Sequence, residues 1–146
     1  MDHAEKNYFA LRRGPYLIAH VMEDSSDRPF CAEGTFVDLA DAHLKILHGI
    51  CLQPGEDLLA ADLSRYGERI CLVGSAGRVE DYRADADGCA MLVKAPDGSR
   101  CALRFKCPEP SGVAAEGASW EYDAASGTLL AEFPGRASGV PLAIRF

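Results

Sequence analysis

The stretch 119-SWEYDAASGTLLAEF-133 decides the fold class, because it holds two short apolar segments on either side of a turn. Pairing Asp123 with Thr128 across the turn collects the large apolar side chains on one face, with Leu130 as the exception. A slip of one residue would mix apolar and charged side chains, and a half-buried strand resists such a slip. The stretch therefore predicts an antiparallel hairpin with one buried face. This register pairs Tyr122 with Leu129, Trp120 with Ala131 and Ala118 with Phe133.

The same pattern of short apolar segments separated by turns recurs along the whole chain, where Gly, Pro, Asp and Ser end the apolar runs about every 8 to 12 residues. It predicts an all-β fold: a two-sheet antiparallel β-sandwich, immunoglobulin-like or jelly-roll-like, with at most one short helix. Residues 55–67 are the best helical candidate, but Pro54-Gly55 favours strand, turn and strand instead. The expected strands are 7–13, 15–23, 34–40, 43–53, 57–63, 69–75, 78–83, 89–95, 100–106, 117–123, 128–133 and 139–146.

Alternation within these strands predicts which side chains are buried. In 43–53 one face carries Leu44, Ile46, Ile50 and Leu52 with His48 among them, and in 15–23 both faces are largely apolar, as in a central strand. A second hairpin is expected in 89-CAMLVKAPDGSRCALRF-105, since Asp-Gly between apolar runs is a strong hairpin signal. Its two-residue turn pairs Pro96 with Ser99, Lys94 with Cys101, Leu92 with Leu103 and Ala90 with Phe105.

Size and charge limit the classes of function. The 146 residues are 48% hydrophobic and 25% charged, which suits one domain spanning residues 1–146. A net charge of −7 with scattered basic residues disfavours nucleic acid. No apolar run is long enough for a membrane span, and no signal peptide is recognised. We expect a cytoplasmic protein if the chain is free-standing; if it is a piece of a longer chain, its location is unknown.

The cysteines follow no metal-binding or redox spacing, because none of them forms a CxxC pair. Without an export signal, free buried thiols are the default expectation and disulfides are the alternative. The six are Cys31, Cys51, Cys71, Cys89, Cys101 and Cys107.

No pattern in the sequence indicates catalysis, a metal or a cofactor. Residues 81–89 alternate acidic residues like a calcium loop, but Arg83 and Lys94 fall at its first and last ligand positions, so a solvated turn is favoured. The four histidines are His3, His20, His43 and His48; they form no metal motif, and His20 and His48 are expected at the core or its rim. GSAG at 74–77 lacks the glycine spacing of a nucleophile elbow.

Several segments resemble a β-sandwich accessory domain found at the C-terminal end of uncharacterised bacterial proteins related to glycoside hydrolases. The matching residues are Arg13-Gly14-Pro15-Tyr16, Val37-Asp38-Leu39, Pro54-Gly55, Asp62-Leu63 and 69-RICLVGSAGRVEDY-82, within about residues 9 to 105. The resemblance implies a sandwich fold and a carbohydrate-active setting, and it carries over no catalytic residue. In that family the domain follows a catalytic region.

The expected function is a non-catalytic accessory module that supports an adjoining catalytic domain or binds glycan weakly. Sugar binding needs exposed aromatic rings, and the candidates are Trp120, Tyr122, Tyr82 and Tyr66, although the hairpin register favours Trp120 and Tyr122 as core. The alternative is a structural or interaction protein that forms a homodimer through sheet edges. A small enzyme built on a histidine beside a carboxylate of perturbed pKa is a third reading.

Overall fold

The computed structural model describes residues 7–24 and 29–146, and all its regular elements there are strands apart from one short 3₁₀ helix. The predicted all-β, antiparallel sandwich-like fold class is therefore confirmed. The chain divides into two compact units, which are described separately: Met1–Asp41 with Lys45–Arg65, and Ala42–Leu44 with Tyr66–Phe146. One domain over residues 1–146 stays a prediction. None of the described residues belongs to a helix long and apolar enough to cross a membrane.

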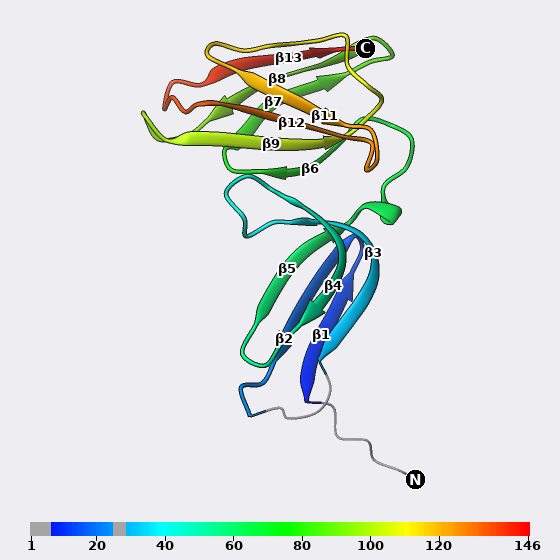
Figure 1. Ribbon diagram of the computed structural model, residues 1–146. Coiled ribbons are helices and arrows are strands. Elements are labelled where there is room, and N and C mark those ends of the chain that lie inside the picture. The colour runs from blue at the N-terminus through cyan, green and yellow to red at the C-terminus, as the bar shows by residue number, and fades with distance from the viewer. Residues whose placement is uncertain (1–6, 25–28) are drawn as a thin grey trace. The chain divides into compact units, whose positions relative to one another are not determined.

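The first unit contains one five-stranded antiparallel sheet in the order β1-β2-β5-β3-β4 (Figure 1). Its strands are β1 (Tyr8–Arg13), β2 (Tyr16–Val21), β3 (Phe30–Asp38), β4 (Ile46–Leu52) and β5 (Asp57–Asp62), followed by the 3₁₀ helix η1 (Leu63–Arg65). Pro54-Gly55 is a turn as expected, and residues 57–62 form a strand rather than a helix. The core of this unit consists of Leu17, Ala19, Val21, Phe36, Ile50, Leu52, Leu58 and Ala60.

The expected alternation fails in β4. The strand begins at Ile46, not at His43, and Leu47 and Ile50 both pack toward the core while His48 is exposed. Gly49 has a φ of 76°, a left-handed conformation that glycine adopts without strain, and the register with β3 shifts at the same place. Because of this irregularity, Leu47 and Ile50 point to the same face of the sheet, although regular alternation would place them on opposite faces. The prediction that His48 lies among the core residues is therefore wrong.

One pair of cysteines also departs from expectation. Cys31 of β3 and Cys51 of β4 are directly opposite each other and form a disulfide. The default expectation of free thiols is wrong for these two, because it did not consider that strand pairing places them together. Cys89, Cys101 and Cys107 are free and buried as expected, and Cys71 is free and half-buried.

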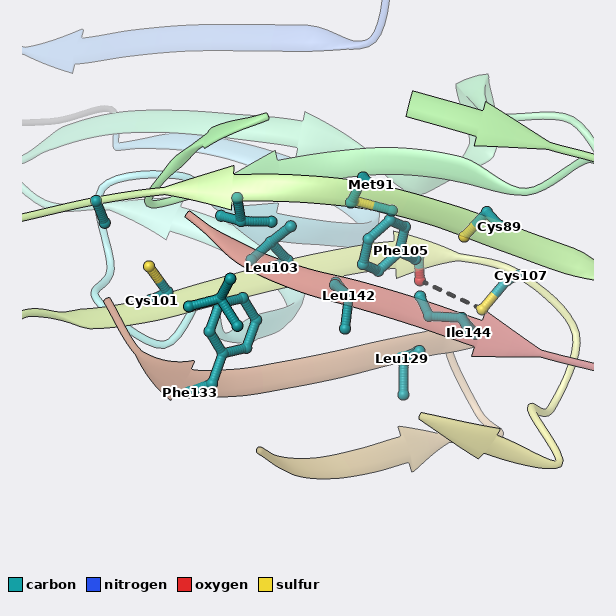
Figure 2. Close-up of a cluster of buried hydrophobic side chains, with 13 residues drawn as sticks. Cys89, Met91, Cys101, Leu103, Phe105, Cys107, Leu129, Phe133, Leu142 and Ile144 are labelled. Atoms are coloured by element: carbon teal, nitrogen blue, oxygen red, sulfur yellow. Dashed lines mark hydrogen bonds between the residues drawn. The ribbon is translucent and has the colours of Figure 1, made fainter. Parts of the chain in front are cut away.

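The second unit is a sandwich of two four-stranded sheets. One sheet has the order β10-β13-β8-β7 and the other the order β11-β12-β9-β6. Both contribute side chains to one core, in which Met91 and Leu142 of the first sheet accompany Leu103, Phe105 and Leu129 of the second (Figure 2). The strands are β6 (Cys71–Ser75), β7 (Arg78–Ala84), β8 (Gly88–Lys94), β9 (Arg100–Lys106), β10 (Gly112–Ala114), β11 (Ser119–Asp123), β12 (Thr128–Pro134) and β13 (Val140–Arg145).

The two predicted hairpins have different outcomes. In β11–β12, Asp123 pairs with Thr128, Tyr122 with Leu129 and Trp120 with Ala131, so the predicted register is confirmed. The turn between β8 and β9 also forms, since the Ser99 N–H donates to the Pro96 carbonyl at 3.0 Å.

The predicted pairing of β8 with β9 is wrong, because the two strands belong to opposite sheets of the sandwich. β8 buries Cys89, Met91 and Val93, not the face that carries Ala90 and Leu92. The two strands thus meet across the core through side chains instead of through backbone hydrogen bonds. β10 is a short strand that the sequence pattern did not predict.

Candidate functional site

The four aromatic candidates for sugar binding lie in different places. Trp120 and Tyr122 are both in β11, Tyr82 is in β7 of the other sheet, and Tyr66 follows η1. An open hollow in the second unit is lined by Tyr66 and Tyr122 together with Lys106, Pro108 and Gly127 among others, but by neither Trp120 nor Tyr82. The structure thus brings two of the four rings to one hollow.

Trp120 is 43% exposed, so the prediction that it lies in the core is wrong. Tyr122, two residues along the same strand, packs against the core, and its hydroxyl donates to the Cys107 carbonyl at 3.1 Å. Burial raises the pKa of Tyr122, so the hydroxyl stays protonated and able to donate. The difference arises because β11 is the terminal strand of its sheet. A side chain there can point toward the core and still be exposed, because the opposite sheet does not extend over it.

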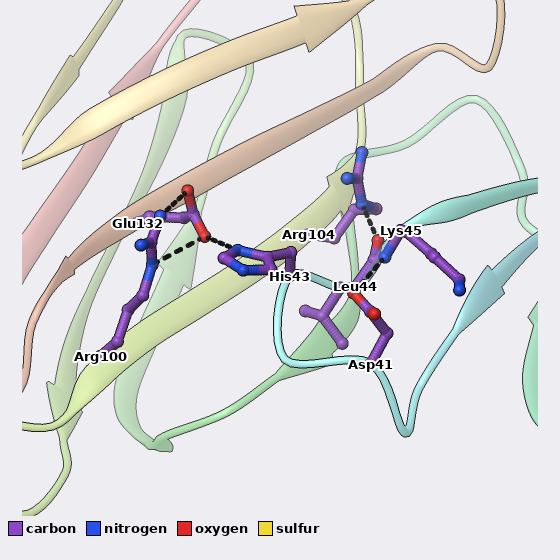
Figure 3. Close-up of polar contacts among 7 residues, drawn as sticks. All are labelled: Asp41, His43, Leu44, Lys45, Arg100, Arg104 and Glu132. Atoms are coloured by element: carbon purple, nitrogen blue, oxygen red, sulfur yellow. Dashed lines mark hydrogen bonds and ion pairs between the residues drawn. The ribbon is translucent and has the colours of Figure 1, made fainter.

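A polar cluster lies on β9 and β12, centred on Glu132 (Figure 3). Arg100 donates to both carboxylate oxygens of Glu132, from Nε at 3.0 Å and from Nη2 at 2.6 Å. The His43 ring Nδ1 lies 2.8 Å from Oε1 of the same carboxylate. The hydrogen bond from Arg100 lowers the pKa of Glu132, with His43 contributing in the same direction.

This cluster contains a histidine–carboxylate pair of the kind that would support a small enzyme, but the state of the carboxylate does not suit a general base. A carboxylate with a lowered pKa and both oxygens engaged is a weak proton acceptor near neutral pH. Nearby, the buried Arg104 donates from Nε to the Leu44 carbonyl at 2.6 Å and from Nη1 to Thr128 Oγ1 at 3.0 Å. Together these contacts hold residues 42–44 on the sheet, so we assign the cluster a structural role.

The remaining motifs from the sequence also form local polar contacts. Asp85 Oδ1 accepts the backbone N–H groups of Asp87 and Gly88 at 2.9 and 3.0 Å, as in the expected acidic turn. His20 Nδ1 lies 2.6 Å from Asp57 Oδ1 at the surface of the first unit. Within residues 7–24 and 29–146, no three His, Cys, Asp or Glu side chains gather as a metal site, and His3 lies outside the described residues.

Sequence reasoning missed an exposed feature, the outer face of β1, β2 and β5. Leu11 of β1 pairs with Ile18 of β2, which pairs in turn with Leu59 of β5, and the three side chains are 47%, 44% and 40% exposed. Phe9 and Tyr16, 58% and 46% exposed, flank this row on the same face. We call these five residues the apolar face.

A signal for the apolar face was present in the sequence but was interpreted differently. Apolar residues on both sides of the 15–23 segment predicted a central strand buried on both faces. β2 does lie between two neighbours, yet only Leu17, Ala19 and Val21 are buried. An apolar sheet face open to solvent is typical of a surface that binds a protein, a membrane or a ligand.

Comparison with known proteins adds no relative, since the chain matches no protein-family model, no curated protein and no solved structure. The resemblance to accessory domains of glycoside-hydrolase-related proteins therefore stays a prediction.

Proposed function

We propose that this protein is a non-catalytic interaction module that self-associates by packing the apolar faces of two copies against each other. The observation that carries the proposal is the continuous exposed row Leu11–Ile18–Leu59, which crosses three paired strands. Isolated apolar side chains are normal on a protein surface, whereas a row of them across a sheet is not.

The sequence of β1 favours a second copy of the chain as the occupant. The strand is aromatic at its start, with Tyr8 and Phe9, and basic at its end, with Arg12 and Arg13. If two copies pack face to face about a two-fold axis, with β1 antiparallel over β1 and Leu11 at the centre, Phe9 of one copy lies over Arg13 of the other, where a cation–π contact is available. A parallel pair would place the arginines against each other. A two-fold dimer is thus self-complementary.

The exposed area is sufficient for a weak dimer. If a fully exposed side chain of this size presents roughly 200 Å², the fractions for the five residues leave about 500 Å² on each copy. Two copies then bury about 1,000 Å², which is near the lower limit for a specific interface. We therefore expect a dissociation constant in the micromolar range. Since each chain carries a net charge of −7, added salt should strengthen the dimer by screening the repulsion.

Sedimentation velocity over a wide range of protein concentration tests this proposal. The wild-type chain should shift from monomer to dimer, and Ile18→Lys should weaken association about 30-fold or more, because it buries a charge in the interface. Tyr82→Lys is the matched control, since Tyr82 is also exposed, at 42%, but lies in the second unit, and it should leave the dimer unchanged. A wild-type chain that stays monomeric at the highest concentrations would refute the proposal.

A second candidate function rests on the exposure of Trp120. A tryptophan that is 43% exposed offers part of a flat ring to the C–H face of a sugar, as an accessory module in a carbohydrate-active setting would require. Isothermal titration calorimetry with soluble oligosaccharides tests this candidate. Glycan binding should be lost in Trp120→Ala and retained in Tyr82→Ala, and no binding by the wild-type chain to any glycan counts against it.

A further inference from the structure

The Cys31–Cys51 disulfide lies at the surface of the first unit. Both residues are exposed, and their neighbours Ala32, Ile50 and Leu52 pack toward the core on the other face. β4, which carries Cys51, is a terminal strand of its sheet. A dissolved molecule can therefore reach the disulfide without any unfolding of the sheet.

The surface beside the disulfide is hollowed. Cys31 and Cys51 line an open hollow together with Glu33, His48 and Gly49. Gly49 leaves room there, because a Cβ built on it would meet only the Ala32 carbonyl oxygen, at 3.8 Å. The charge that lines the hollow is negative, from Glu33, on a chain that is acidic overall.

Of the four free cysteines of the second unit, Cys71 is half-buried and the other three have the opposite properties. Cys89, Cys101 and Cys107 are buried in the sandwich core, as Figure 2 shows. Burial raises the pKa of both Cys89 and Cys107 to about 11, so almost no thiolate exists at neutral pH. Because the thiolate is the reactive form, the exposed pair is more accessible to thiol chemistry than these three buried thiols.

We propose that the Cys31–Cys51 pair is a thiol–disulfide exchange site that reacts with low-molecular-weight thiols and disfavours those with a net negative charge. The thiolate of the small molecule attacks one cysteine sulfur, a new S–S bond forms, and the other cysteine leaves as a thiolate that takes a proton from water. A second small thiol attacks the mixed disulfide and releases it as a small-molecule disulfide. Two small thiols are thus oxidised while the protein disulfide is reduced to two thiols.

The first test measures where reduction occurs in the folded protein. Chain prepared without reductant is treated with excess cysteamine, and new thiols are trapped with iodoacetamide and located by peptide mass spectrometry. Label should appear on Cys31 and Cys51 about 100-fold faster than on the buried Cys89, Cys101 and Cys107. The site is overturned if labelling of the pair needs urea. It is also overturned if the pair is isolated as thiols that oxidised glutathione does not convert to a disulfide.

The second test addresses the preference for charge. Glu33→Gln removes the carboxylate from the hollow, and Glu121→Gln, an exposed residue on β11, is the matched control. Glu33→Gln should speed reduction by anionic glutathione about 2-fold to 3-fold relative to wild type and leave the rate with cysteamine nearly unchanged. Expressing each rate as a ratio to wild type cancels the intrinsic reactivity of each thiol. Equal ratios for the two thiols would refute the charge preference.

Discussion

Replacing Glu132 by glutamine should destabilise the second unit in a pH-dependent way. The substitution keeps the size of the side chain and removes its charge. In the wild-type chain the carboxylate side chain is 15% exposed and accepts two hydrogen bonds from Arg100 and one from His43. A glutamine carbonyl can accept such bonds, but without the charge that strengthens them.

The expected loss of stability is modest. Hydrogen bonds to a charged group contribute about 1.5–3 kcal/mol each when buried, but Arg100 and His43 are 59% and 55% exposed, so solvent screens both partners. We therefore expect a loss of about 1.5 kcal/mol at pH 7. For a chain of this size that corresponds to a decrease in Tm of about 4 °C.

The dependence on pH follows from the lowered pKa of Glu132. A carboxyl group whose folded pKa lies below its ordinary value of 4.5 stabilises the fold above that value. This contribution disappears as the pH falls through the folded pKa. The difference in stability between wild type and Glu132→Gln should therefore be full at pH 7 and shrink steadily below about pH 4.5.

Equilibrium urea denaturation followed by Trp120 fluorescence provides the assay, since β11, which carries Trp120, pairs with β12, which carries Glu132. Glu121→Gln is the control, because this exposed residue of β11 should contribute little. The reasoning is refuted if Glu132→Gln is as stable as wild type at pH 7. It is equally refuted if the deficit is the same at pH 7 and at pH 3.

Two further predictions concern a glycine of β8 and the disulfide of the first unit. Gly88→Ala should cost about 1–3 kcal/mol, because the added Cβ would collide with the Ile144 carbonyl oxygen. Gly112→Ala, with no heavy atom within 4 Å of its Cβ, should cost much less, and thermal unfolding by circular dichroism compares the two variants. Cys51→Ser should destabilise the first unit by about 3 kcal/mol, because the disulfide closes a loop with a sequence separation of 20. Urea unfolding in the absence of reductant measures the loss, and an unchanged unfolding midpoint would contradict this prediction.

Local features of the fold were predictable because they depend on residues close in sequence. The register of β11 with β12 follows from one turn and one apolar face, and both lie within fifteen residues of sequence. The turn at Asp97-Gly98 was also predicted correctly. The error there concerned the partners of β8 and β9. β8 lies between β7 and β13, and β9 lies between β6 and β12, so each pairs with a strand that comes later in the chain than the predicted hairpin.

The candidate sites were less predictable than the strands. Alternation indicated the face on which Trp120 lies, but not that this face is open at the terminal strand β11. The same limit applies to the apolar face. Alternation correctly predicted that Ile18 and its neighbours in β2 point to opposite faces, but the prediction that both faces are buried was wrong. Whether a face is covered depends on side chains from distant segments, and no local pattern reports them.

The sequence by itself determined that the chain forms short antiparallel strands, where many of them begin and end, and which side chains share a face in most of them. These properties arise from backbone geometry and turn chemistry over a few neighbouring residues. Only the tertiary structure decided that β8 and β9 join opposite sheets, that Cys31 meets Cys51, and that the row Leu11–Ile18–Leu59 faces solvent. Each of these outcomes depends on contacts between residues far apart in the chain, where many pairings satisfy the same alternation and only packing of the whole unit selects one.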